Sequence, residues 1–144
     1  MANPVCEVLL TDIPLQRSQT IHCGSGAVLE FFGVVRALED DQEITGIDYE
    51  AHPAMAVHQL EQIAQEATTQ FGLNSAIIHH RTGFVAVGEA SVFVRTTSRN
   101  RAESYSANQW IMEELKKRVP IWKRPQFKIP AGDRVRRSDS VPSR

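Results

Sequence analysis

Several kinds of residue and segment are scarce in this sequence, and each scarcity excludes a class of protein. Cys6 and Cys23 are the only cysteines, too few for a disulfide framework or a cysteine-based metal site. No apolar run approaches the roughly 20 residues of a membrane helix, and no basic residues precede the short apolar stretch at the N-terminus, as they would in a secretory signal. The sequence also contains no P-loop and no GxGxxG motif. We therefore expect a cytoplasmic protein with no membrane segment, no metal site and no resident cofactor.

Positive charge is scarce in the first 115 residues, which contain 6 Lys and Arg against 15 Asp and Glu. Residues 116–144 reverse this balance, with 10 Lys and Arg against 2 Asp and Glu. The net charge of −1 therefore hides a basic C-terminal fifth on an acidic body. Such a division indicates that the basic end contacts an anion or an acidic partner.

The remaining composition is that of a globular protein, with 42% hydrophobic and 23% charged residues. The length suits one domain, which we place at residues 1–137. Residues 138–144 form a predicted disordered tail.

The residue patterns predict an α+β fold, an antiparallel sheet with two main helices on one side, because the strands arrive in adjacent pairs. Residues 16–26, the acidic stretch 38–43 and the glycine-containing link 83–89 are read as connections. A short hairpin is expected around Pro130–Gly132. The predicted strands are 5–11, 27–36, 46–51, 75–80 and 90–97, and the predicted helices are 53–70 and 102–118.

The most unusual segment is Leu115–Arg124, LKKRVPIWKR. Pro120 cannot continue the preceding helix, so a basic helix end, a rigid turn and a second basic pair are expected in succession. Lys116 and Lys123 could then converge on one anionic ligand. The alternative is an ordinary solvated cluster of cations at a helix C-terminus, where the helix dipole favours them.

Other side chains support anion binding less directly. Arg36, Arg81, Arg99 and Arg101 all fall at predicted strand ends or loops, and guanidinium groups match phosphate geometry. Each of them alone is more often a surface residue, and only joint placement beside the basic turn favours a site. His79 and His80 are neighbours on a predicted strand and face opposite sides, so they cannot chelate one metal ion. Neither cysteine lies near a histidine, which makes lysine the better candidate for acid, base or nucleophile.

Six motifs together resemble the MoaE family, the large catalytic subunits of molybdopterin synthase. The lysine pair seven residues apart across a Pro-x-Trp is the most specific of them. The motifs are GAVLEFFGVVR at 26–36, YEAHPAM at 49–55, HRTG at 80–83, GE at 88–89, TSRNRAESY at 97–105 and LKKRVPIWKR at 115–124.

The resemblance implies an α/β-hammerhead-like fold and a sulfurtransferase that inserts two sulfurs into cyclic pyranopterin monophosphate. The sulfur would come from a C-terminal Gly-Gly thiocarboxylate on a small ubiquitin-like carrier subunit. The large subunit would form a homodimer, and the complex a heterotetramer. The resemblance assigns catalysis to Lys116 and Lys123, and substrate binding to Val34, Val35, Arg36, Asn100, Arg101, Lys116, Lys123, Arg124 and Pro125.

One departure from the family is Asn100, which stands where a histidine is common. A second hypothesis also remains open, that of a non-catalytic domain whose basic end binds nucleic acid or an acidic protein. The aromatic residues argue against nucleic acid, because most fall in predicted core strands rather than on a basic face where bases could stack.

Overall fold

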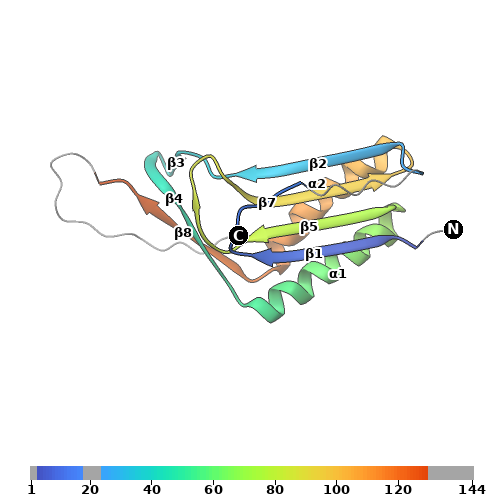
Figure 1. Cartoon of the computed structure of the whole chain (residues 1–144), viewed down its shortest axis with the longest axis horizontal. Coiled ribbons are helices and arrows are strands. Elements are labelled where there is room, and N and C mark those ends of the chain that lie inside the picture. Colours follow the sequence, from blue (N-terminus) through green and yellow to red (C-terminus); the bar gives the residue numbers. More distant parts are fainter. Residues whose placement is uncertain (1–2, 18–23, 130–144) are drawn as a thin grey trace.

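The computed structural model describes residues 3–17 and 24–129. Its main sheet has the strand order β1-β5-β7-β2 (Figure 1). β2 pairs with β7 and β7 with β5 in antiparallel register, but β1 pairs with β5 in parallel. The expected antiparallel sheet is therefore a mixed one, because one of its three strand pairings is parallel. The strands are β1 (Val5–Thr11), β2 (Ala27–Val34), β5 (Ser75–Arg81) and β7 (Ala90–Ser98).

A second, smaller sheet forms around the long strand β4 (Gln42–Ala51), which pairs with three neighbours. Three expectations are wrong here. The acidic stretch 38–43 is a hairpin, the glycine-containing link holds a strand, and the segment after Pro120 continues as a strand. The neighbours are β3 (Leu38–Glu39), β6 (Gly83–Ala86) and β8 (Ile121–Phe127).

The two helices are α1 (Pro53–Phe71) and α2 (Arg101–Arg118), both close to the predicted bounds. Pro53 begins α1, and Gly72 ends it in the left-handed conformation that glycine adopts readily. Both helices cover the same face of the main sheet, as predicted (Figure 1). The predicted apolar stripe of α2 is buried in the core between helices and sheet: Ala107, Ile111 and Leu115.

A second core cluster lies under β4, and Tyr49 packs against both clusters. Tyr49 therefore joins the cores of the two sheets. The hairpin expected around Pro130–Gly132 and the tail at 138–144 fall outside the described residues. Neither of the two described helices is long and apolar enough to cross a membrane.

Candidate active site

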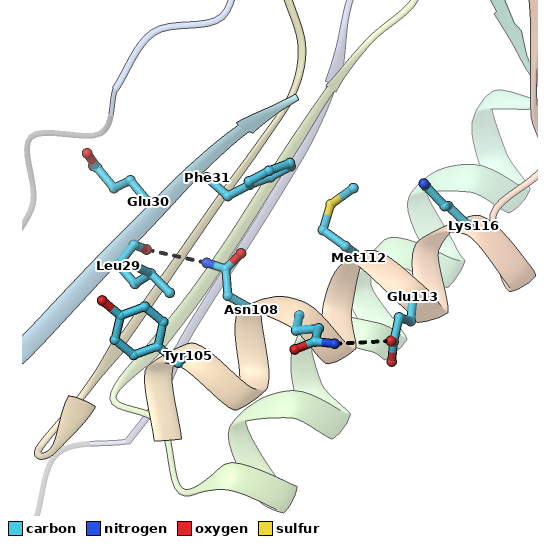
Figure 2. A pocket seen from close by; sticks show the side chains of 9 residues that line it. Leu29, Glu30, Phe31, Tyr105, Asn108, Met112, Glu113 and Lys116 are labelled. Atoms are coloured by element: carbon cyan, nitrogen blue, oxygen red, sulfur yellow. Dashed lines mark hydrogen bonds between the residues drawn. The ribbon is translucent and has the colours of Figure 1, made fainter. Parts of the chain in front are cut away.

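A groove of about 520 Å³ lies between β2 and α2, and one of the candidate residues, Lys116, lines it (Figure 2). It forms because α2 runs alongside β2 and presents one helical face toward it, with side chains three or four residues apart. Its surface is mainly apolar. The carboxylate of Glu30 is already held by Arg17 at 2.8 Å and by Arg95 at 2.9 Å. The groove is lined by Leu29, Glu30, Phe31, Tyr105, Asn108, Gln109, Met112, Glu113 and Lys116.

The buried amide of Asn108 fixes the position of α2 against the sheet. Its nitrogen lies 3.5 Å from the carbonyl oxygen of Leu29 and 3.2 Å from that of Val94. On the other side of the groove, β2 is an edge strand, which pairs with β7 alone within the described part of the chain. An edge strand offers free N–H and C=O groups to an added extended peptide.

Lys116 lies on the last turn of α2 and lines the groove (Figure 2). Its ammonium group has no hydrogen-bond or ion-pair partner among residues 3–17 and 24–129. The neighbouring Lys117 differs, because its ammonium lies 3.4 Å from Glu114 on the solvent side of the helix. Of these two adjacent lysines, Lys116 is therefore the one available to an anion.

Lys123 lies on β8 opposite Tyr49 of β4, and its side chain is 30% exposed. Its ammonium is 3.3 Å from the carboxylate of Glu39, a residue that the sequence analysis assigned to an exposed loop. Arg124 is also paired, with Glu50, while Pro125 is buried. The second candidate lysine is thus held by a carboxylate in this structure.

Val34 ends β2, and Val35 and Arg36 follow it at the end of the sheet toward which α2 also runs, because α2 and β2 run in the same direction (Figure 1). The backbone of Val35 is fixed by two hydrogen bonds. Its N–H donates to Glu89, and its carbonyl accepts from Gly88. Arg36 is exposed and has no polar partner within the described residues. Its guanidinium group is therefore available to an anion.

Asn100 and Arg101 lie at the opposite end of α2, where Asn100 is the N-cap residue. Fifteen residues separate Arg101 from Lys116, and at 1.5 Å per residue this is about 22 Å along the helix. Within one copy of the chain, these two cations cannot contact the same small substrate. Arg101 therefore does not lie beside the basic segment of its own chain.

Arg81 is not available to a ligand either. It is buried, its guanidinium lies 2.8 Å from Glu89, and it also donates to the carbonyl oxygen of Phe84. This contact closes the turn from β5 into β6. Arg81 is therefore part of the scaffold.

His79 and His80 each have a structural partner. His79 lies 2.7 Å from Glu7, while His80 donates from Nδ1 to the carbonyl oxygen of Arg81 and contacts the ring of Tyr49. Burial lowers the pKa of His80 below its usual 6.5, so this ring is neutral at pH 7. Cys6 is a free, exposed thiol, and Cys23 lies outside the described residues. Within residues 3–17 and 24–129, no three His, Cys, Asp or Glu side chains come together as metal ligands.

The MoaE protein family model matches residues 10–118. The chain belongs to the MoaE family. It is 37% identical to the molybdopterin synthase catalytic subunit of Emericella nidulans over 81% of this chain and 67% of that protein. It is 34% identical to that of Thermoplasma volcanium, over 86% and 92% of the two chains. These relatives favour the catalytic hypothesis over the non-catalytic basic domain.

Two solved structures share the fold. Molybdopterin synthase from Staphylococcus aureus superposes with a TM-score of 0.78 at 31% identity, over 83% of this chain and 90% of that one. A complex of subunits 1 and 2 of molybdopterin-converting factor from Helicobacter pylori gives 0.64 at 20% identity, over 85% and 84%. The predicted α+β class is thereby confirmed.

Proposed function

We propose that this chain is the catalytic subunit of a molybdopterin synthase. It takes sulfur from a thiocarboxylated ubiquitin-like carrier and inserts two sulfur atoms into cyclic pyranopterin monophosphate. The chain belongs to the MoaE family. Within that family, the observation that supports the proposal most directly is the position of Lys116. It presents an unpaired ammonium within the described residues and lines a mainly apolar groove.

The groove suits the extended C-terminal tail of the carrier. A tail laid along the free edge of β2 gains backbone hydrogen bonds, and Gly-Gly residues allow close approach to Phe31 and Met112. The thiocarboxylate would then lie at Lys116. The Helicobacter pylori structure, a complex of subunits 1 and 2 of molybdopterin-converting factor, supports a partner subunit for this chain.

The chemistry needs charge neutralisation and proton transfer rather than a protein nucleophile. The thiocarboxylate sulfur is itself the nucleophile, and an oxyanion develops when its acyl group is later attacked by water. Ammonium groups of Lys116 and Lys123 would stabilise that charge and transfer protons. The substrate would be bound by Val34, Val35, Arg36, Arg124 and Pro125.

The free thiol of Cys6 is typical of a protein in a reducing compartment, which supports a cytoplasmic setting for this chain.

Asn100 and Arg101 join this site only if a second copy supplies them. The separation of about 22 Å along α2 prevents Arg101 from acting beside Lys116 of its own chain. We propose that the chain forms a homodimer in which Arg101 of one copy binds the substrate anion in the site of the second copy. Two carrier subunits bound to this homodimer would make a heterotetramer.

Mixing two inactive variants tests this arrangement. Arg101→Ala and Lys116→Ala homodimers should each be nearly inactive, while mixed dimers contain one site with both residues intact. Activity should therefore reappear on mixing and subunit exchange. Inactive mixtures with demonstrated exchange would contradict a shared site.

The function itself is tested by reconstitution with a thiocarboxylated carrier and the pyranopterin precursor. The expected result is loss of thiocarboxylate and appearance of the dithiolene product, both absent with a carboxylate-terminated carrier. Polynucleotide binding with a steep salt dependence and no sulfur transfer would favour the non-catalytic alternative.

A further inference from the structure

The ion pair between Glu39 and Lys123 joins two elements that are distant in the sequence. Glu39 belongs to β3 and Lys123 to β8, and the carboxylate and ammonium are 3.3 Å apart. Both side chains are sheltered, with exposures of 20% for Glu39 and 30% for Lys123. Lys123 has no other polar partner within the described residues. Glu39 therefore determines where this ammonium lies.

The backbone around Glu39 is tightly constrained. β3 and β4 form a hairpin in which Glu39 pairs with Gln42, so its loop contains only Asp40 and Asp41. Both loop residues are left-handed, with φ of 50° and 62°, as in the type I′ turn that suits two-residue hairpins. The carboxylate thus projects from a short, well-defined turn rather than from a solvated loop.

The backbone of Lys123 is equally fixed, because β8 pairs with β4 over its whole length. The backbone alone does not fix the position of its ammonium, because the flexible four-carbon side chain can adopt many rotamers. A carboxylate at hydrogen-bonding distance favours one of these side-chain rotamers over the others. A fixed orientation affects the reaction only if the ammonium acts on the substrate from a defined position.

We propose that Glu39 is a positioning residue that holds the Lys123 ammonium for sulfur transfer. This inference rests on the proposed function, which places Lys123 at the reacting centre. Glu39 has the wrong charge to attract an anionic pyranopterin phosphate. Its removal should therefore slow the reaction without weakening precursor binding, a combination that general destabilisation of the site does not produce.

Glu39→Gln tests this prediction, with Glu43→Gln as the matched control. Glu43 lies in the same hairpin, and its carboxylate is 3.6 Å from Lys128. Under saturating single-turnover conditions, Glu39→Gln should reduce the rate of sulfur transfer by about tenfold or more. Precursor affinity should be unchanged or tighter, and Glu43→Gln should match the wild type. In a Lys123→Ala background, Glu39→Gln should cause no further loss.

Amine labelling tests the ion pair independently of activity. Lys123 should react faster with an amine-selective reagent in Glu39→Gln than in the wild type, whereas labelling of Lys116 should not change. Unchanged labelling of Lys123, or faster labelling with an unchanged transfer rate, would overturn the positioning role. If Lys123→Ala itself is fully active, the proposed function of Lys123 fails as well, so the two failures are distinguishable.

Discussion

The side-chain amide of Asn108 on α2 lies 3.5 Å from the carbonyl oxygen of Leu29 on β2 and donates to it. This contact fixes the helix against the edge strand at the floor of the groove (Figure 2). Met112 and Lys116 follow at intervals of four residues on the same helical face. The backbone position of Lys116 at the groove is therefore set by a helix that is held in place two turns earlier.

Lys116→Ala should lower the rate of sulfur transfer by about 10²–10⁴, the range typical of acid–base groups. Folding should be intact, because Lys116 is exposed and unpaired within the described residues. Lys117→Ala is the matched control, since Lys117 is 71% exposed and pairs with Glu114 away from the groove. Single-turnover rates and thermal unfolding of both variants provide the measurement. Equal, mild losses in the two variants would reduce the site to a diffuse basic surface.

Arg101→Ala should weaken binding of the pyranopterin precursor strongly, because Arg101 is exposed and has no described partner to compete with the phosphate. Asn100→Ala should cost only about 0.5–1.5 kcal/mol, the contribution of one neutral hydrogen bond. Asn100→His should bind the precursor more tightly at pH 6 than at pH 8, since a histidine gains charge near pH 6.5. Affinity measured at both pH values tests all three. Loss of binding in Asn100→Ala with tolerance of Arg101→Ala would show that this pocket is misassigned.

Replacing both cysteines with serine should leave single-turnover sulfur transfer nearly unchanged. The carrier supplies the nucleophile, and Cys6 lies beside Thr68 of α1, with its sulfur 3.8 Å from the hydroxyl oxygen. Circular dichroism of the double variant controls for folding. A folded variant that no longer transfers sulfur would mean that a cysteine relays it.

His80 should make the stability of the fold depend on pH. Burial lowers its pKa below the usual 6.5, so in the pH range below 6.5 the unfolded chain binds a proton that the folded chain does not. The free energy of unfolding should therefore fall as the pH decreases from 6.5, by at most about 1.4 kcal/mol per pH unit from this group. His80→Gln should show a smaller decrease between pH 7 and pH 5 in urea titrations. Identical slopes in the two proteins would contradict this assignment.

The elements that the sequence predicts well are those whose signals are local. Pro53 and Gly72 mark the ends of α1, and the stripe Ala107, Ile111 and Leu115 defines the buried face of α2. The parallel pairing of β1 with β5 has no local signal, because it depends on which strands meet after the chain has folded. The sheet order therefore had to come from the structure.

In the second sheet the sequence predicts only part of β4, at residues 46–51, because the other strands are short or contain residues that are uncommon in strands. β3 has two residues, and its turn of Asp40 and Asp41 reads as a solvated acidic loop. β8 contains Pro125 and a basic pair, which favour a turn over a strand. For the same reason Glu39 went unnoticed, although Lys116 and Lys123 were identified from their spacing. The distance between Arg101 and Lys116 becomes apparent only when both are placed on one helix.

Transfer of sulfur from the carrier to the pterin is tested most directly with a carrier whose thiocarboxylate contains a heavy sulfur isotope. The carrier is incubated with this chain and cyclic pyranopterin monophosphate, and the pterin product is analysed by mass spectrometry. We expect the wild-type chain to form a product with two heavy sulfur atoms, and Lys116→Ala to form much less of it. If the pterin gains no heavy sulfur, the chain does not transfer sulfur from the carrier. If it gains heavy sulfur equally with the wild type and with Lys116→Ala, the proposed role of Lys116 is wrong.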